Sequence, residues 1–336
     1  MVTKASLLPD AISPNHLPAI ANAKILKLCD IINHVVGDET SKLSSRPKLV
    51  AILAVLIVVM AISYSMMNYS NLKSNVRLFL NWTTNVSSAS ALIMSALATF
   101  QAFEISKIRK KRVNKINDYS EPKYQLYTLT WFTMGLILWF IAELSWTYYE
   151  LGLGIENPYP SPADAIWLAG YPFIIYFLFG ISKVLSRQKF SYDREPLILI
   201  SVATALTLAY IFTLTFGIAS MISNQQNMVA WIITIIYPIL DGIAFVPSLL
   251  IIMKLRNKKQ IESIRPWMLL AASILLVTVA DIGFGYSEVL GKTVEQGRVG
   301  IWDAIYSAGY IVMAVSMYWR YRILSTQKVQ LVKTLR

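Results

Sequence analysis

Long apolar stretches separated by short polar segments make up most of this chain of 336 residues. The hydrocarbon core of a bilayer is about 30 Å thick, and a helix needs roughly 20 apolar residues to cross it. We find eight such stretches: Leu49–Tyr69, Val86–Ser106, Leu126–Tyr149, Ala163–Val184, Pro196–Ile222, Met228–Met253, Pro266–Leu290 and Ile301–Tyr318. Because backbone groups must be paired in lipid, each is predicted to be a helix. The sequence predicts an all-α membrane protein with eight transmembrane helices.

The distribution of charge supports a lipid environment and argues against nucleic acid as a partner. Charged residues are 15% of the chain, whereas about a quarter is usual in a soluble domain. The net charge of +12 comes from short basic clusters between apolar stretches, not from one continuous basic face. The lone cysteine, Cys29, excludes an intramolecular disulfide and any multi-cysteine metal site.

Lysine and arginine also predict the orientation in the membrane. If the N-terminus is cytoplasmic, the inner segments hold 27 of the 31 basic residues and the outer segments hold 4. Inner loops carry such an excess in membrane proteins. We therefore expect a multi-pass protein of the cell membrane with both termini inside.

An internal repeat divides the predicted helices into two sets. Asp164–Tyr171 reads DAIWLAGY and Asp303–Tyr310 reads DAIYSAGY, with six of eight positions identical. Ala142–Glu150 and Ala280–Glu288, which precede them, are related by nearly the same offset. The sequence predicts two parallel four-helix repeats over residues 49–184 and 185–319, an arrangement that occurs in some transporters.

The leader and the tail are predicted to be cytoplasmic. Within the leader, residues 1–48, Ala21–Val36 has the pattern of a basic amphipathic helix. Such a helix lies along the membrane surface or packs against the protein's own cytoplasmic face. Residues 320–336 form a basic tail. Sequons begin at Asn68, Asn81 and Asn85, beside the first outer loop, and are candidate glycosylation sites.

Acidic residues inside apolar stretches are the first candidates for a functional site, because charge is unfavourable in lipid. Glu143 and Asp281 fall in the outer third of outgoing helices, and Asp164 and Asp303 begin the returning helices. No lysine or arginine lies deep in a stretch to pair with them. The repeat predicts that these four carboxylates gather near the outer leaflet. Asp241, near the middle of its stretch, is a candidate proton or cation relay.

Aromatic residues at the same level complete the predicted ligand-binding set. The candidates are Trp146, Tyr171, Tyr286 and Tyr310. Acids together with aromatic faces bind cations, since each cation–π contact contributes about 0.5–2 kcal/mol. The alternative is an aromatic belt at the membrane interface.

The acids also have structural interpretations. Ser161, Pro162 and Asp164 have the spacing of a helix N-cap, in which the acid reaches back to the serine. In the structural interpretation, Glu143 and Asp281 form hydrogen bonds between helices. Glu104 is expected to pair with Lys107.

Catalytic signatures are missing from the sequence. No stretch holds a deeply placed lysine for a retinal, or histidines for an intramembrane zinc site. There is no glycine-rich phosphate loop and no Gly-x-Ser-x-Gly. We expect no catalytic residue, metal or cofactor, and do not expect an enzyme.

Several motifs together resemble a known membrane module. They are NPYPSPADAIWLAGYP at Asn157–Pro172, YPILD at Tyr237–Asp241, and Asp281 followed by Asp303 and Tyr310. They resemble the multi-span N-terminal sensor regions of some diguanylate cyclases and histidine kinases, which carry a Pro-Ser-x-Ala-Asp…Gly-Tyr-Pro pattern. The resemblance implies a sensory role and recurrent acids at these positions. Since the tail is too short for a kinase or cyclase domain, signalling would require a separate protein or an oligomeric partner.

Three functions stay open from the sequence. The first is a sensory or ligand-binding module with an outward-facing acidic and aromatic site. The second is a proton- or cation-coupled transporter that uses Asp241. The third is a structural subunit whose acids only bond helices together.

Overall fold

The computed structural model describes residues 73–113, 120–155, 158–186, 228–256, 261–289 and 299–334, with isolated helical positions between 198 and 209. The predicted leader helix, the first predicted span and nearly all of the fifth lie outside these residues. The helices are α3 (Lys73–Val113), α4 (Ser120–Thr147), the π-helix η1 (Tyr148–Gly152), α5 (Pro162–Ser186), α7 (Met228–Arg256), α8 (Ile261–Val289) and α9 (Val299–Lys333). Within the described residues the fold is entirely helical.

Five helices of the described part are long and apolar enough to cross a membrane. Their candidate spans are Leu78–Lys110, Leu126–Gly152, Pro162–Ser182, Met228–Met253 and Arg265–Tyr286. These segments overlap the second, third, fourth, sixth and seventh predicted stretches. Helix α9 contains the eighth, Ile301–Tyr318, without belonging to this set. The chain is an α-helical membrane protein, and the count of eight spans stays a prediction.

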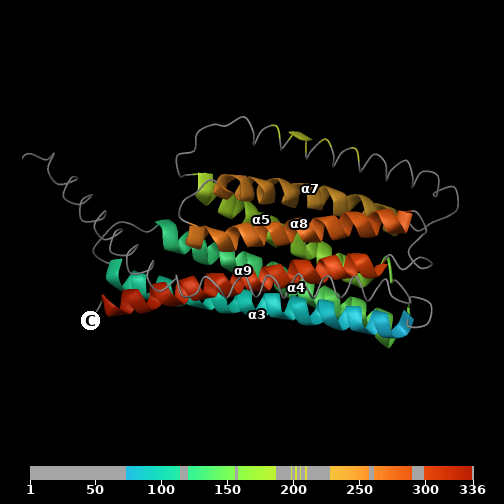
Figure 1. The fold of residues 1–336 in the computed structure, drawn as a ribbon, viewed down its shortest axis with the longest axis horizontal. Coiled ribbons are helices and arrows are strands. Elements are labelled where there is room, and N and C mark those ends of the chain that lie inside the picture. The colour runs from blue at the N-terminus through green and yellow to red at the C-terminus, as the bar shows by residue number, and fades with distance from the viewer. Residues whose placement is uncertain are drawn as a thin grey trace, which may run out of the picture. The chain divides into compact units, whose positions relative to one another are not determined.

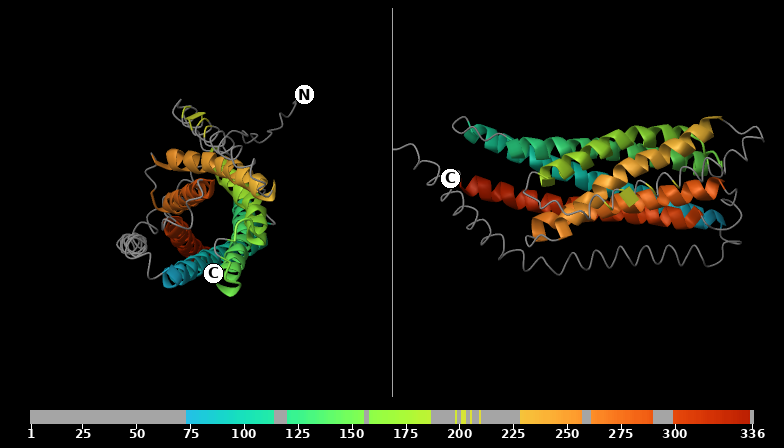
Figure 2. Two further views of the ribbon diagram at one scale, coloured as in Figure 1. Left: turned by 90° about the vertical axis from the view of Figure 1, so that its right-hand side faces the viewer. Right: turned by 90° about the horizontal axis from the view of Figure 1, so that it is seen from above.

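The described helices lie side by side (Figure 1) and close into a ring. Each helix packs against two neighbours, in the order α3, α4, α5, α7, α8, α9 and back to α3. Figure 2 shows this ring along its axis in the left-hand view. Helices α3, α5, α7 and α9 begin at the end of the ring where α4 and α8 finish. We call this the pocket end and the opposite end the basic end.

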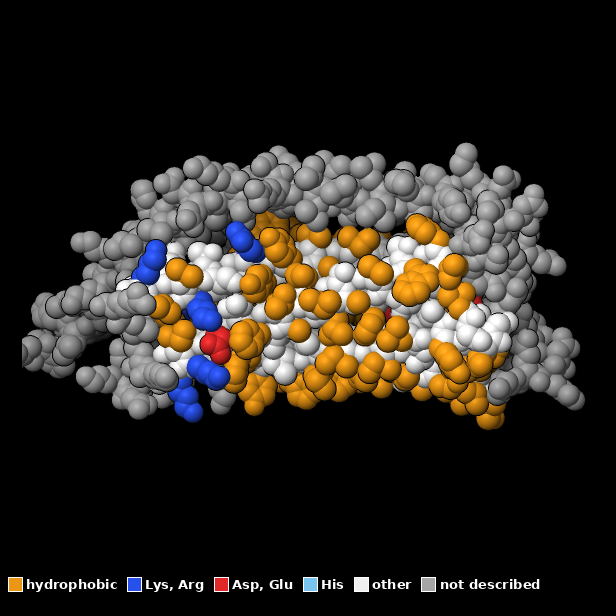
Figure 3. Space-filling view, turned by 90° about the horizontal axis from the view of Figure 1, so that it is seen from below, with side chains coloured by type: hydrophobic (Ala, Val, Ile, Leu, Met, Phe, Trp, Pro, Cys, Tyr) orange, Lys and Arg blue, Asp and Glu red, His pale blue; other side chains and the backbone are white. Residues whose placement is uncertain are grey.

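The interior changes in character along the ring axis. Toward the middle and the basic end it is filled by fully buried apolar side chains, which include Leu129, Phe132, Phe177, Ile251 and Leu270. The outer surface carries many exposed large hydrophobic side chains, as contact with lipid requires. Lysines and arginines gather at the basic end of the face in Figure 3. There Glu104 pairs with Lys107 at 3.6 Å, as predicted, and with Lys328 at 3.7 Å.

Glycine allows helices α4 and α5 to approach closely beside the pocket. An alanine Cβ at Gly170 would lie 2.6 Å from Nε1 of Trp139 and 3.3 Å from the carbonyl oxygen of Gly135. The Trp139 indole is buried and donates a 3.2 Å hydrogen bond to the carbonyl oxygen of Trp167, so it has little room to move.

We therefore expect Gly170→Ala to destabilise the protein by about 1–3 kcal/mol, the usual effect of overpacking a core. The measurement is the thermal unfolding midpoint of the detergent-purified protein. The matched control is Gly152→Ala, whose new Cβ would meet only the Tyr148 side chain at 3.1 Å, and that side chain is 61% exposed. Equal midpoints for the two variants would contradict the close packing.

Candidate functional site

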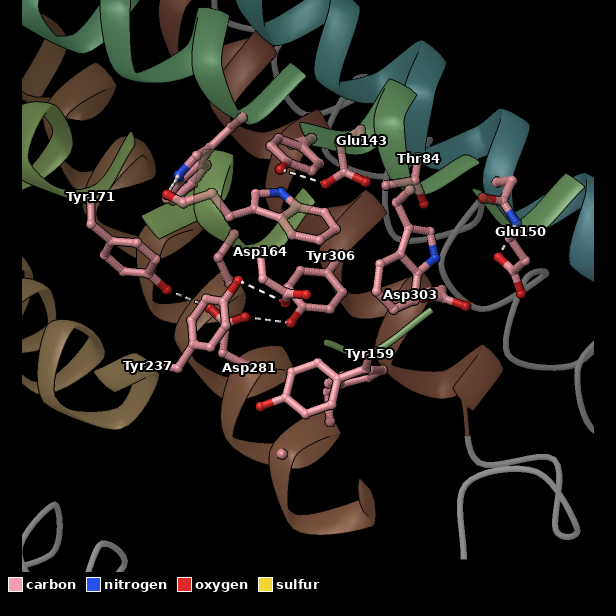
Figure 4. A pocket seen from close by; sticks show the side chains of 18 of the residues that line it. Thr84, Glu143, Glu150, Tyr159, Asp164, Tyr171, Tyr237, Asp281, Asp303 and Tyr306 are labelled. Atoms are coloured by element: carbon pink, nitrogen blue, oxygen red, sulfur yellow. Dashed lines mark hydrogen bonds between the residues drawn. The ribbon is translucent and has the colours of Figure 1, made fainter. Parts of the chain in front are cut away.

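A cavity of about 100 Å³ lies at the pocket end of the ring (Figure 4). All the ring helices contribute to its wall. The lining residues are Asn81, Thr84, Trp139, Glu143, Trp146, Glu150, Tyr159, Asp164, Trp167, Tyr171, Thr234, Tyr237, Pro238, Val277, Asp281, Phe284, Gly285, Asp303, Tyr306 and Tyr310. We call this cavity the acidic pocket.

The lining is strongly acidic. Five of its side chains carry a carboxyl group, namely Glu143, Glu150, Asp164, Asp281 and Asp303. Among these described lining residues there is no lysine, arginine or histidine to balance them. The ring excludes most water from such groups, so their field inside the pocket is screened less than it would be at an exposed surface.

Most of the predicted site residues come together in this pocket. The four carboxylates Glu143, Asp164, Asp281 and Asp303 all line it, with Trp146, Tyr171 and Tyr310. Tyr286 does not: its side chain is 46% exposed and stands outside the pocket. Asp241 is also absent from the lining, and it lies behind Tyr171 on α7.

Asp281 and Asp241 share one tyrosine. The hydroxyl of Tyr171, on α5, lies 2.7 Å from Oδ1 of Asp241 and 2.7 Å from Oδ2 of Asp281. The Tyr306 hydroxyl also donates to Asp281. A phenol carries one hydrogen, so Tyr171 donates a hydrogen bond to only one of the two acids. In the other contact the carboxyl group of the acid donates to the Tyr171 oxygen. Oδ2 of Asp241 has no hydrogen-bond partner within the described part of the chain, although the residue is only 2% exposed.

Glu143 is held in a corresponding way on the other side of the pocket. The Tyr310 hydroxyl, on α9, donates a 2.7 Å hydrogen bond to Oε1 of Glu143, on α4. A carboxylate of α4 thus binds a tyrosine of α9, whereas the carboxylate of α8 binds a tyrosine of α5. These buried bonds tie the two pairs of helices together around the cavity.

The two acids that begin helices differ in their partners. Asp164 accepts a 2.7 Å hydrogen bond from the backbone N–H of Ser161, which confirms the predicted N-cap at the start of α5. The Tyr237 hydroxyl donates to its other oxygen at 3.3 Å. For Asp303, no side-chain hydrogen bond is found among the residues that the structure describes. Asp303 therefore contributes an acceptor whose hydrogen-bonding capacity is still open.

Aromatic rings form the rest of the wall. Trp146 packs against Trp167, with ring centroids 5.6 Å apart, and against Phe284 at 6.0 Å. Tyr159 contacts the same Phe284 at 6.1 Å. These rings line the pocket, whereas Tyr148 and Tyr286 are exposed.

A row of polar residues on α3 was missing from the sequence prediction. Helix α3 begins at Lys73, well before the predicted start at Val86, so Asn81, Thr84 and Asn85 are helical. Asn81 donates to Glu150 at 2.8 Å, the Thr84 and Ser307 hydroxyls lie 2.8 Å apart, and Asn85 donates to Thr147 at 2.6 Å.

This row has a consequence for the sequons. The amide nitrogens of Asn81 and Asn85 are hydrogen-bonded and both residues are buried, so the structure argues against their glycosylation. Asn68 lies outside the described residues. The signal that reveals the row is the spacing of three and four between the polar residues, which places them on one face of a helix.

Comparisons with known proteins give no relative for this chain. No protein-family model matches it, and neither curated proteins nor solved structures give a significant match. Its function is therefore argued from the acidic pocket itself.

Proposed function

We propose that this membrane protein is a sensory or ligand-binding module that takes up a small organic cation in the acidic pocket. The observation that carries the proposal is a single cavity with five carboxyl side chains, no basic lining residue among those described, and walls of tryptophan and tyrosine. Charge pairing and cation–π contacts both favour a cation in such surroundings.

Two observations support an organic cation over a metal ion. Among the described residues, no three histidine, cysteine, aspartate or glutamate side chains are grouped closely enough to hold a metal. The space of about 100 Å³ also exceeds what a bare ion needs. It is smaller than the roughly 300–1,000 Å³ of a drug-sized ligand site. A ligand of a few non-hydrogen atoms fits these limits.

The distribution of charge supports a pocket that opens to the outside. Lysines and arginines lie at the basic end (Figure 3), where Lys107 and Lys328 flank Glu104. By the positive-inside tendency, we expect that end to lie in the cytoplasm. The acidic pocket, at the other end, then faces the exterior.

The proposal includes two structurally related halves. Glu143 and Asp281 occupy matching positions in the repeat, as do Tyr171 and Tyr310. Their hydrogen bonds run crosswise, from Tyr310 to Glu143 and from Tyr171 to Asp281. A pseudo-twofold axis through the pocket accounts for this exchange of partners.

A cation transporter is the second candidate, and Asp241 is the observation that favours it. Asp241 is buried behind Tyr171 and contacts its hydroxyl, so it adds a polar group just beyond the lining of the pocket. Beyond it, the fully buried Phe132, Phe177 and Leu270 fill the ring. These large apolar side chains occupy the ring beyond Asp241 in the described part of the chain, which favours binding over passage.

Isothermal titration calorimetry on the detergent-purified chain tests the proposal. The probes are choline, tetramethylammonium and n-butylammonium, with 3,3-dimethylbutan-1-ol as the neutral counterpart of choline. We expect an ammonium probe to bind about tenfold or more tightly than the neutral alcohol, because only the cation gains charge pairing and cation–π contacts. Equal binding of choline and the alcohol, or no binding of any cation, would overturn the proposal and favour a structural subunit.

A further inference from the structure

The carboxyl groups of the acidic pocket fall into two groups. Asp164 and Asp281, on α5 and α8, form one group, which we call the α8 group. Glu143, Glu150 and Asp303, on α4, η1 and α9, form the other, which we call the α4 group. In Figure 4 the Tyr306 ring is drawn between Asp281 and Asp303, and Glu150 lies beyond Asp303.

Charge interactions run along the row of carboxyl groups and also join the two groups, since Glu143 lies within electrostatic range of Asp281. Asp164 lies within electrostatic range of Asp281. Asp303 lies within range of Glu150 and Glu143. One monovalent cation that pairs with the α8 group leaves the α4 group without an opposite charge, and the reverse also holds.

Each group also has an acceptor whose hydrogen bonding is incomplete. Behind the α8 group, Oδ2 of the buried Asp241 has no partner among the described residues, and its Oδ1 reaches Asp281 through the Tyr171 hydroxyl. In the α4 group, no described side chain donates to Asp303. Asp303 lines the pocket and can accept a hydrogen bond from a bound ligand, whereas Asp241 lies behind Tyr171 and connects to the pocket through that hydroxyl.

The wall between the groups is aromatic. Trp146 and Trp167 stack at 5.6 Å, and Phe284 faces Trp146 at 6.0 Å. Such surfaces hold hydrocarbon well and add cation–π attraction for charges at their edges. A short alkyl chain can lie against them with a charged group at each end.

Resting on the cation-binding function, we propose that the ligand of the acidic pocket carries two ammonium groups joined by a short alkyl chain. One ammonium group pairs with Asp281 and Asp164, and the other pairs with Asp303 of the α4 group. Each ammonium group brings three N–H donors, and the open acceptor of Asp303 can take one of them.

Calorimetry with n-butylammonium and 1,4-diammoniobutane at neutral pH tests this inference on the full chain. These probes have the same alkyl chain and differ by one charged group. We expect the diammonium probe to bind about 10- to 100-fold more tightly, as a second charge-assisted contact predicts. Extending the chain from three to six carbons should give one optimum length, because the separation of the two groups is fixed by the helices.

The variant Asp303→Asn tests whether the second ammonium group binds to the α4 group. Asparagine keeps the size of the side chain, and Asp303 has no described hydrogen-bond donor that the change would strand. We expect the ratio of diammonium to monoammonium affinity to fall toward one in this variant. Glu104→Gln, at the basic end, should retain the wild-type ratio.

The outcomes separate this inference from the proposed function. Equal affinities for the two wild-type probes would overturn the two-charge ligand, and so would an unchanged ratio in folded Asp303→Asn. Both results leave the cation-binding function in place. Failure of every ammonium compound to bind would overturn the proposed function as well. If Asp303→Asn does not fold, the wild-type ratio and its dependence on chain length still decide the question.

Discussion

Asp281→Asn is expected to lower the affinity for ammonium probes by about 30-fold or more, since removing one partner of a buried charge pair costs about 2–5 kcal/mol. Asp281 lines the pocket, and its carboxyl group is fixed by hydrogen bonds with the hydroxyl groups of Tyr171 and Tyr306. Asparagine preserves the shape of this side chain and removes its charge. The loss should therefore appear in the affinity measured by calorimetry, with little change in the elution volume of the folded protein.

Glu104→Gln is the matched control for this variant. Glu104 is also an acid of the helical region, but it pairs with Lys107 and Lys328 at the basic end, away from the pocket. Its replacement should leave ammonium affinity at the wild-type value. A folded Asp281→Asn protein that binds as tightly as Glu104→Gln would show that the pocket carboxylate is not used for cation binding.

The largest effect on stability is expected for Tyr171→Phe. Tyr171 is 3% exposed, and its hydroxyl contacts carboxyl oxygens of both Asp241 and Asp281. Without the hydroxyl, one buried oxygen of each acid loses its partner. Each unsatisfied buried group costs about 1–3 kcal/mol, so we expect a loss of about 2–4 kcal/mol in the free energy of unfolding.

Two other tyrosine variants, measured in the same detergent, serve as references for Tyr171→Phe. Tyr310→Phe removes one contact, to Glu143, and should destabilise the protein by roughly half as much as Tyr171→Phe. Tyr286→Phe alters an exposed side chain outside the pocket and should have almost no effect. If Tyr171→Phe and Tyr286→Phe have the same free energy of unfolding in denaturant, the contacts of the Tyr171 hydroxyl do not stabilise the ring.

The class of fold and many of the pocket residues were predictable because charge is conspicuous in an apolar stretch. Glu143 and Asp281 interrupt otherwise hydrophobic helices, and such residues rarely face lipid. The start of α5 was also predictable, since Ser161, Pro162 and Asp164 form a local signal that needs no tertiary contact.

The polar face of α3 was harder to predict because uncharged polar residues resemble a loop when only hydropathy is considered. Asn81 and Asn85 lower the hydropathy of their segment, although their amides are satisfied by Glu150 and Thr147 across the ring. These partners lie 69 and 62 residues away in the chain. Tertiary packing of this kind leaves little trace in local composition.

The choice between neighbouring aromatic residues likewise depends on packing. Tyr286 and Tyr306 both lie near the pocket end, but only Tyr306 faces the cavity, where it donates to Asp281. The closure of the ring by α3 against α9 decides which helix faces turn inward. The order of helices around a bundle is not fixed by the length or spacing of apolar stretches.

The position of a bound ammonium ion tests the central claim most directly. Crystals of the protein grown with (3-bromopropyl)trimethylammonium allow the bromine to be located by its anomalous scattering. If the acidic pocket binds cations, we expect a bromine peak inside it, with the ammonium group against Asp281 or Glu143 and beside Trp146. A pocket filled only by water, with the bromine elsewhere or absent at saturating probe, would contradict it.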